Sequence, residues 1–450
     1  MRGDTIFAPA TAAGRAGVAI IRISGPRAGA ALEDLIGKMP EPRVATHVQF
    51  SDRAQGHVID DGLALWFPAP HSFTGEDVAE LHVHGSRAVL QAVMALLARL
   101  GLRPAEAGEF TRRAFDNGKL DLAQVEGLAD LIAAETEAQR RQARRQLDGV
   151  LGGVTEGWRA RLLRMLAHAE AEIDFPDEDL PGGLIAALGA DIDVLAAEIR
   201  AHLADQRGER LREGLSIAIV GPPNAGKSSL LNALAKREAA IVSATAGTTR
   251  DVIEVQLDLG GYPVTVADTA GLRALPASSD GHAAIESEGI RRALARAESA
   301  DLKLLVLDAT AGEPDESVTR LIDASTLVVL NKIDAAPHAQ PSIAGLVWPI
   351  SVKTGEGVAA LVTALTVETA KRLAEQGGAA PLITRARHRA ALAECVTALE
   401  RAHGLIVSGC APELLAEDLR LAMRSLGRIT GRVAVDDILD VVFREFCIGK

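Results

Sequence analysis

The sequence predicts a multidomain protein of mixed α/β and all-α structure, with an α/β domain inserted into a helical one. Its 450 residues are too many for one ordinary domain and suggest about three. Short β-branched runs separated by turns fill roughly the first 115 positions, whereas helical spacing begins at Leu120 and returns after Gly377 and Gly378. Between about Leu215 and Lys371, apolar strands alternate with helices.

The first predicted domain covers residues 1–118 and is expected to be α+β. Its apolar, β-branched runs have the length of strands and are bounded by turn residues. A run at helical spacing follows them and is ended by Gly101 and Pro104. The expected strands are Val18–Ile23, Gly62–Phe67 and Val78–Val83, and the expected helix is Val89–Leu100.

Two helical stretches, residues 119–213 and 375–450, flank the α/β segment 214–374. Apolar residues recur every three or four positions in each stretch, for example at Leu122 and Val125. The simplest arrangement packs the two stretches together as one discontinuous helical domain. The strand and helix alternation of the inserted segment predicts a parallel sheet.

The composition is that of a globular protein with no membrane segment. Charged residues are 24% of the chain, no apolar run approaches the ~20 residues of a span, and the N-terminus lacks a secretion signal. A net charge of −12 disfavours nucleic-acid binding over the whole surface, so any RNA contact has to be local. Cys395, Cys410 and Cys447 are scattered, which predicts a reducing, cytoplasmic location. The last four residues only outline a prenylation box, because Gly449 is not aliphatic and Lys450 is an unusual final residue.

A glycine-rich phosphate loop is the strongest single motif. Residues 221–228 read Gly-Pro-Pro-Asn-Ala-Gly-Lys-Ser, after the apolar run that starts at Ile217 and before the expected helix Leu230–Leu234. In this context the backbone amides and the helix N-terminus can hold phosphates, Lys227 can reach the β and γ groups, and Ser228 can bind Mg²⁺. Taken alone, the pattern could still be a fortuitous glycine-rich turn.

Four further motifs stand in the order that a guanine-nucleotide domain requires. Thr249 can serve as the switch threonine, Asp268 can support the Mg²⁺ shell, and the Asp334 carboxylate can accept the N1 and N2 hydrogens of guanine, which adenine does not offer. Together with the phosphate loop they predict a Ras-like domain that binds GTP. The motifs are Gly-Thr-Thr-Arg-Asp at 247–251, Asp-Thr-Ala-Gly at 268–271, Asn-Lys-Ile-Asp at 331–334 and Ser-Val-Lys at 351–353.

One position departs from the Ras pattern. Leu272 follows the Asp-Thr-Ala-Gly motif, where Ras-like proteins carry the glutamine that orients the attacking water. Hydrolysis therefore needs another arrangement. The residues leave three open: an arginine finger from a partner, a monovalent cation, or a carboxylate from the following loop.

Three features together are similar to the potassium-activated GTPases: Asn224 in the phosphate loop, Ser-Ala-Thr-Ala-Gly-Thr-Thr at 243–249, and Leu272 with Ile-Glu-Ser-Glu-Gly-Ile at 285–290. Among these proteins the sequence resembles the MnmE family, also called TrmE, along nearly its whole length. The resemblance implies a K⁺ ion that takes the electrostatic role of an arginine finger. The implied K⁺ ligands are Asn224, the main chain of Ser243 and Thr245, and Thr248.

The resemblance also implies that Glu286 positions the attacking water through a second water. Glu288 is available as well, and Glu286 could instead be a solvated acid at a helix start. The implied Mg²⁺ ligands are Ser228 and Thr249. The expected GTP contacts are Asn224, Ala225, Gly226, Lys227, Ser228, Ser229, Ser243, Ala244, Thr245, Ala246, Gly247, Thr248, Thr249, Asp268, Thr269, Ala270, Gly271, Asn331, Lys332, Ile333, Asp334, Ser351, Val352 and Lys353.

Segments of the N-terminal domain resemble the same family, among them residues 14–25, 72–85 and 108–124. In that family the domain dimerises and binds a folate of the 5-formyltetrahydrofolate type. The resemblance implies folate contacts from Arg22, Glu80, Lys119 and Lys450; taken singly, each could be a plain surface charge. Cations suit the folate carboxylates, and Glu80 could accept hydrogens from the pterin. His82 and His84 alternate on a strand without a third metal ligand, so we expect a structural role for them.

Two features of the helical stretches leave alternatives open. The family also ends in Cys-Ile-Gly-Lys, and the resemblance implies that Cys447 matters for the modification chemistry; a plain core cysteine is equally compatible. Two arginine groups could meet RNA phosphates or form solvated faces, and the solvated face is the favoured interpretation. They are Arg140, Arg141, Arg144 and Arg145, and Arg420, Arg424, Arg428 and Arg432.

The resemblance implies a cytoplasmic, homodimeric GTPase that modifies tRNA. With the FAD-dependent partner MnmG, in a heterotetramer, it would convert C5 of the wobble uridine at position 34 to an aminomethyl or carboxymethylaminomethyl form with a tetrahydrofolate one-carbon unit. K⁺-stimulated hydrolysis would be coupled to G-domain dimerisation. Two other classes are alternatives: a ribosome-assembly GTPase, for which no RNA-binding module is evident, and a self-sufficient folate-dependent methyltransferase, for which no activated nucleophile is evident.

Overall fold

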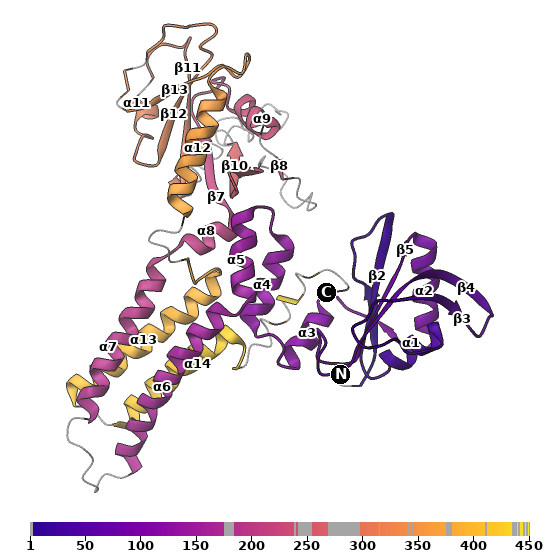
Figure 1. Ribbon diagram of the computed structural model, residues 1–450. Helices are drawn as coiled ribbons and strands as arrows, with labels where there is room; N and C mark the ends of the chain where they lie inside the picture. Colours follow the sequence, from indigo (N-terminus) through magenta and orange to yellow (C-terminus); the bar gives the residue numbers. More distant parts are fainter. Residues whose placement is uncertain are drawn as a thin grey trace, which may run out of the picture. The chain divides into compact units, whose positions relative to one another are not determined.

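The computed structural model describes residues 3–174, 184–237, 240–241, 254–268, 298–314, 316–340, 342–343, 345–374, 380–409, 412–433, 439, 442–443, 446 and 449, and every structural statement below concerns these residues. They form two compact units. The first unit comprises Met1–Ala129, Arg145–Asp193 and Glu394–Lys450; the second comprises Asp130–Arg144 and Val194–Ala393. The fold class is confirmed: an N-terminal α+β part, helices from the two stretches that flank the insertion, and an inserted α/β part (Figure 1).

The N-terminal part of the first unit is built on a six-stranded sheet in the order β3-β4-β5-β2-β1-β6. The pairs are antiparallel except for β1 with β6. All three strands expected from the sequence are present, within longer elements. The strands are β1 (Ile6–Pro9), β2 (Ala16–Ser24), β3 (Thr46–Asp52), β4 (His57–Phe67), β5 (Val78–Gly85) and β6 (Arg103–Pro104).

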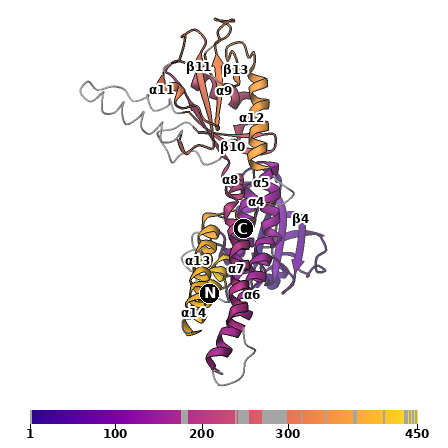
Figure 2. The same cartoon turned by 90° about the vertical axis from the view of Figure 1, so that its left-hand side faces the viewer.

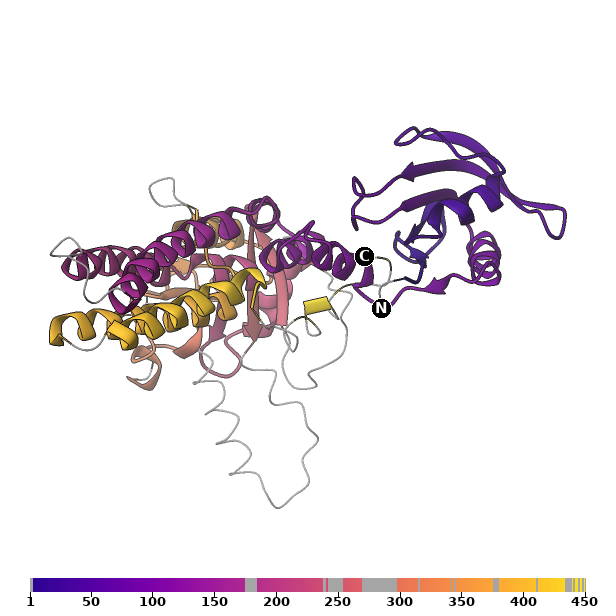
Figure 3. The same cartoon turned by 90° about the horizontal axis from the view of Figure 1, so that it is seen from below.

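Alternation along β2 divides this sheet into an apolar face and a mixed face. Ile21 and Ile23 are fully buried in a core with residues of the helices α1 (Ala28–Ile36) and α2 (Arg87–Arg99), which lie beside the sheet in Figure 3. Arg22, between them, points to the opposite face because side chains alternate along a strand. The chain leaves the sheet through α3 (Glu109–Asp116).

The helices of the two flanking stretches do pack together, as expected. In the first unit α6 (Val150–Asp174) and α14 (Pro412–Thr430) lie side by side along much of their length (Figures 1 and 2). Buried Leu162 and Leu419 belong to these helices, and Arg420 of α14 pairs with Glu170 of α6. The remaining helices of the stretches are α4 (Leu122–Ala133), α5 (Glu137–Leu147), α7 (Leu184–Ala204), α8 (Arg207–Glu213) and α13 (Ala386–Ser408), of which α4, α5, α7 and α13 each contribute residues to both units.

Near the C-terminus, the described residues pack against α3 and α4. Val442, Phe443 and Phe446 share a buried cluster with Leu122 and Val125. The segment then reaches the N-terminal sheet, where Gly449 has a φ of 99° and a side chain would collide with the carbonyl of Pro9. Glycine at this position is therefore required for the close approach of the tail.

The second unit holds a seven-stranded sheet in the order β13-β12-β11-β7-β10-β9-β8. The prediction of a parallel sheet is correct for five strands and wrong at one edge, where β9 pairs antiparallel with both β10 and β8. A two-glycine turn joins β9 to β10 and makes them a hairpin, for which antiparallel pairing is required. The strands are β7 (Leu215–Val220), β8 (Ala240–Ile241), β9 (Glu254–Leu259), β10 (Tyr262–Asp268), β11 (Leu302–Asp308), β12 (Thr326–Asn331) and β13 (Val347–Pro349).

Both faces of this sheet are buried. Ile217 and Ile219 of β7 join one core with residues of α9 (Lys227–Arg237) and α12 (Val358–Leu373), whereas Ala218 and Val220 join a second core on the other face, with residues in and near α11 (Glu316–Thr319). This arrangement places the carboxyl ends of β7, β11 and β12 at one edge, where ligands of open α/β sheets bind. No helix among the described residues is both long and apolar enough to cross a membrane.

Candidate functional site

The phosphate loop connects β7 to α9 as the motif predicts. Gly226 adopts a φ of 98°, and any side chain there would collide with the amide of Asn331, so this loop position needs glycine. Asn224 also has a positive φ, 63°, and its side chain is exposed. Asparagine is one of the few residues that tolerate this conformation. Its side chain is therefore accessible from solvent.

Lys227 begins α9 and is held inside the loop. Its side chain is buried, and Nζ donates hydrogen bonds to the carbonyls of Gly221 and Pro222, each at 2.8 Å. A buried ammonium favours a nearby anion, because burial penalises an uncompensated charge. The backbone amides at the N-terminus of α9 favour an anion at the same place.

Asn331, at the end of β12, ties the phosphate loop to the expected base-binding loops. Its Nδ2 donates to the carbonyl of Ala225 at 2.9 Å, and its Oδ1 accepts from the amide of Val352 at 3.2 Å. The side chain is buried, so both hydrogen bonds are shielded from water. The sequence predicts a nucleotide contact for Asn331, and the structure adds a bridging role within the protein that the sequence did not predict.

Asp334 and Ser351 lie together at the same edge. The Ser351 hydroxyl donates to Oδ1 of Asp334 at 2.7 Å and accepts from the amide of Thr354 at 3.1 Å. Lys353 Nζ lies 3.9 Å from Oδ2 of Asp334. The hydroxyl bond orients the carboxylate and leaves acceptor capacity for a planar pair of N–H groups.

An ion pair that the sequence did not predict supports this loop. Lys332 adopts a φ of 68°, and its Nζ pairs at 2.6 Å with Oδ2 of Asp308, at the end of β11. Burial disfavours ionisation of Asp308, but hydrogen bonds from Lys332 and Thr310 outweigh it and lower the pKa of Asp308. The pair ties the loop after β12 to the end of β11.

The switch residues can be placed only in part. The backbone of Asp268 ends β10 and is paired with Ile219 of β7, next to the phosphate loop. The other predicted switch, potassium and catalytic residues lie outside the described residues: Ser243, Ala244, Thr245, Ala246, Gly247, Thr248, Thr249, Thr269, Ala270, Gly271 and Glu286.

The predicted folate residues of the N-terminal domain gather on the mixed face of its sheet. Arg22 and Glu80 are cross-strand neighbours, and Arg22 Nε donates to Glu80 Oε1 at 2.9 Å. The Arg22 guanidinium also lies over the rings of Phe73 and Phe110, at 5.5 and 5.8 Å from their centroids. The two predicted contacts thus form one ion pair beside an aromatic side chain, Phe73, that remains partly exposed.

Lys119 belongs to the same neighbourhood. Its methylene stem lies beside Gly75, in the segment that carries Phe73, and Asn117 donates to the carbonyl of Thr74 at 2.7 Å. Lys450 and Cys447 lie outside the described residues, but Gly449 between them contacts Pro9 of β1. The strand β1 pairs with β2, which carries Arg22.

Comparison with known proteins identifies the family. The family model for the GTP-binding protein TrmE N-terminus matches residues 5–119, and the model for the MnmE helical domain matches residues 122–447. The tRNA modification GTPase MnmE of Parvibaculum lavamentivorans is 58% identical over 450 residues, covering 99% of this chain and 100% of that protein. The chain belongs to the MnmE family. The protein of the same name from Paramagnetospirillum magneticum is 59% identical, with the same coverage.

Family membership makes the inserted α/β domain that of a GTPase, as the motifs predicted. A solved G domain, from the FeoB iron transporter of Thermotoga maritima, is 27% identical over 35% of this chain and 98% of that chain, with a TM-score of 0.25.

This member of the MnmE family contains an ionic network that sequence reasoning missed. Arg113 is buried and donates to Glu76, Glu109 and Asp4, while Arg103 pairs with Glu109 and Asp4. Glu76 also accepts from the hydroxyl of Ser24 on β2, at 2.7 Å. Only Glu109 and Arg113 stand at a helical spacing, four positions apart on α3, and the fold brings the other members to them. The network fixes α3 against the sheet that carries Arg22.

The arginine groups of this MnmE-family chain form ion pairs in the structure. Arg140 and Arg141 both bind Glu137, one turn away on α5, and Arg144 and Arg145 also have interactions. In the second group Arg420, Arg424, Arg428 and Arg432 bind Glu170, Glu417, Glu394 and Glu156. These pairs support the favoured interpretation of solvated, charge-compensated faces.

His84 is engaged within the N-terminal domain, and among the described residues no group of three or more His, Cys, Asp or Glu side chains could hold a metal ion. His84 Nδ1 lies 2.8 Å from Asp60 on the neighbouring strand. His82 Nε2 lies 3.5 Å from Glu80 Oε2.

Proposed function

We propose that this chain hydrolyses GTP to drive a tRNA modification. With the FAD-dependent partner MnmG it converts C5 of the wobble uridine, position 34, of certain tRNAs to an aminomethyl or carboxymethylaminomethyl form. The one-carbon unit comes from a tetrahydrofolate of the 5-formyl type. The substrate class is supported by the relatives, which are tRNA modification GTPases.

The side chain of Asn331 carries the nucleotide half of this proposal. It joins the phosphate loop at Ala225 to the loop of Val352, so phosphate and base contacts are built as one unit. Asp334, oriented by Ser351, then selects guanine, and Lys227 binds the β and γ phosphates. The proposed GTP contacts are the full set of residues predicted from the sequence.

The residues near the phosphate loop fit a Mg²⁺ ion. Ser228 follows Lys227 in the first turn of α9, and the register of β10 on β7 places the backbone of Asp268 beside Ile219. Hydroxyl and carboxylate oxygens are hard ligands of the kind that Mg²⁺ prefers. Ser228 and Thr249 would bind the ion directly.

The loop also fits a K⁺ ion on its open side, where Asn224 is exposed. Asn224, Ser243, Thr245 and Thr248 would hold it, and a bound cation supplies positive charge between the β and γ phosphates. Glu286 would position the attacking water. Two G domains would have to meet to close this arrangement, so the proposed active form is a homodimer that assembles with MnmG in a heterotetramer in the cytoplasm.

The mixed face of the N-terminal sheet would receive the folate. The exposed part of Phe73 offers a surface for the pterin, and Glu80, paired with Arg22, keeps a second carboxylate oxygen for the ring N–H groups. Lys119 and Lys450 would bind the glutamate carboxylate. Cys447 is proposed to act close to the transferred carbon.

Incubation of the purified chain with MnmG, unmodified tRNA, folate and glycine or ammonium tests the proposal, with wobble nucleosides measured by mass spectrometry. We expect product with GTP and at least a tenfold loss with GDP or with Lys227→Ala. Product formed equally well with GDP would contradict the proposed role of hydrolysis. No product under any condition would contradict the assigned reaction.

A further inference from the structure

The hairpin β9–β10 lies between the two segments expected to contact the γ-phosphate. Thr249 precedes β9 by five positions, and the Asp268 motif begins at the last residue of β10. Six residue pairs, from Leu259 with Tyr262 to Glu254 with Ala267, hold the two strands in register. A displacement of either end is therefore carried by the whole hairpin to its turn.

The turn of this hairpin is bonded to the start of α5. The amide of Gly261 donates to Oδ1 of Asp258 at 2.6 Å, which closes the turn. The carbonyl of Gly261 accepts from the amide of Ala138 at 3.0 Å. Ala138 is the second residue of α5, where an amide has no acceptor within its own helix. The hairpin supplies the acceptor that this helix end lacks.

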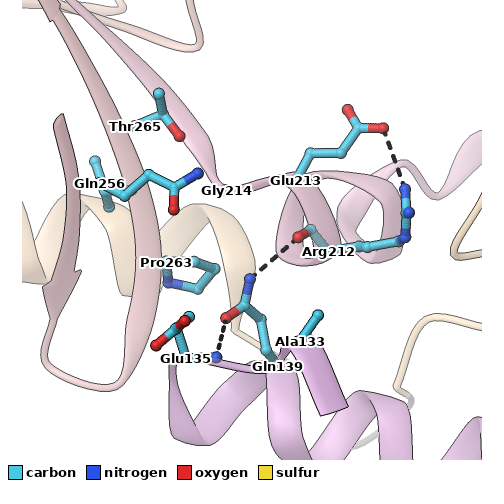
Figure 4. Close-up of a pocket in the computed structure, with 10 residues that line it drawn as sticks. Ala133, Glu135, Gln139, Arg212, Glu213, Gly214, Gln256, Pro263 and Thr265 are labelled. Carbon is cyan, nitrogen blue, oxygen red and sulfur yellow. Dashed lines mark hydrogen bonds and ion pairs between the residues drawn. The ribbon is translucent and has the colours of Figure 1, made fainter. Parts of the chain in front are cut away.

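Gln139 connects the same helix end to α8 (Figure 4). Its Oε1 accepts from the amides of Glu135 and Thr136, both at 3.1 Å, and its Nε2 donates to the carbonyl of Arg212 at 3.1 Å. The first contacts form a capping box at the N-terminus of α5. The last contact holds α5 on α8, which leads through Gly214 into β7 and the phosphate loop.

A polar cavity of about 160 Å³ separates the hairpin from this helical corner (Figure 4). Gln256, Pro263 and Thr265 line it from the hairpin, and Glu135 and Glu213 line it from the helices. The volume and the polar lining suit several water molecules. The polar side of the hairpin therefore borders this cavity, whereas its apolar side packs in the core of the domain, and a backbone hydrogen bond joins its turn to α5.

We propose that the hairpin β9–β10 reports the state of the nucleotide to α5 through the bond between Gly261 and Ala138. The inference rests on the proposed function, because the switch segments move the hairpin only if they bind a γ-phosphate. When both segments engage the γ-phosphate, the hairpin is drawn toward it and its turn leaves α5. The last three residues of α5, from Arg145, belong to the first unit, so the helix that receives the change is shared by the two units.

Hydrogen exchange of the full-length protein tests the proposal, with GDP compared with a non-hydrolysable GTP analogue. The amide of Ala138, read in peptides spanning residues 134–142, is expected to exchange roughly two- to tenfold faster with the analogue, the effect of losing one hydrogen bond. Equal exchange in the two states, while the phosphate-loop peptide responds, would overturn the inference. A phosphate loop that responds to neither nucleotide would overturn the proposed function, and this inference with it.

A matched pair of proline variants isolates the single bond. Ala138→Pro removes the donor, whereas Glu137→Pro places proline in the same first turn, which tolerates it, and keeps the donor. GTP turnover and the phosphate-loop response are expected to stay within about twofold in both, because neither residue belongs to the nucleotide site. The difference in hydrogen exchange between the GDP and analogue states at residues 141–147 should vanish in Ala138→Pro and persist in Glu137→Pro. A difference that persists in Ala138→Pro would contradict the proposal.

Discussion

At the scale of single residues, the nucleotide site depends on side chains that organise loops as much as on side chains that face the ligand. Asn331 bonds Ala225, 106 positions earlier in the chain, and Val352, 21 positions later. Ser351 in turn orients Asp334. The geometry that selects guanine is therefore set before any nucleotide binds, which lowers the ordering cost of binding.

Replacing Asp334 with asparagine is expected to change the preferred base. A carboxylate accepts both hydrogens of guanine, whereas an amide can donate to the carbonyl that xanthine carries in place of the amino group. We expect the GTP dissociation constant to rise on the order of 100-fold and XTP to bind more tightly than GTP. Fluorescent-nucleotide titration measures both. Ser351→Ala, which keeps the Asp334 carboxylate, should weaken GTP binding only about fivefold. Unchanged GTP binding by Asp334→Asn would contradict the prediction.

The ionic network around Glu109 predicts a pH dependence of stability. Burial opposes ionisation of Glu109, but hydrogen bonds from Arg103, the Glu106 amide and Arg113 lower its pKa below the ordinary 4.5. A lowered folded-state pKa stabilises the protein fully above the unfolded pKa, and the contribution is lost as the pH falls through the folded value. We expect Glu109→Gln to lower the free energy of unfolding by about 2 kcal/mol at pH 7. As the pH falls below 4.5, the variant should lose less stability than the wild type, and urea unfolding measures both effects. Parallel losses in the two proteins would contradict this account.

At the scale of elements, local patterns predicted what local physics determines. Helical spacing from Leu122 marked α4, and the glycine-rich motif marked the junction of β7 and α9. The sequence analysis missed the antiparallel pairing of β9. The alternation of strands and helices predicted a parallel sheet throughout, although the short Gly260-Gly261 turn is typical of a β-hairpin. The Arg103 and Arg113 network and the bridging role of Asn331 were missed for another reason. They depend on contacts between distant segments, which periodicity does not encode.

The packing of α14 on α6 predicts that the two units respond separately to mutation. Leu419 on α14 is fully buried, so Leu419→Ala should destabilise the first unit by about 2–5 kcal/mol. The core of the G domain lies in the other unit, and GDP affinity should be unchanged. Calorimetry with and without GDP measures both effects. As a control, Val407→Ala, at a position 75% exposed, should change the free energy of unfolding by less than about 0.5 kcal/mol. A loss of GDP affinity in Leu419→Ala would contradict the prediction that the units respond separately.

At the scale of the whole molecule, the insertion of the G domain between two helical stretches is the feature that would link hydrolysis to the proposed tRNA reaction. The chain enters the domain through α8 and β7 and leaves it through α12, while α5 contacts both α8 and the β9–β10 hairpin. The proposed tRNA chemistry belongs to the N-terminal part and the C-terminal tail. Nucleotide-driven rearrangement, rather than shared active-site atoms, would then connect the two.

The central claim is that a potassium ion replaces the missing catalytic side chain, and GTP turnover in KCl against NaCl at equal ionic strength tests it most directly. The account predicts turnover at least about tenfold faster in KCl, a difference that should disappear in Asn224→Gly. Glycine suits this variant because it accepts the positive φ of Asn224 without strain. Equal turnover of the wild-type protein in the two salts would contradict the claim.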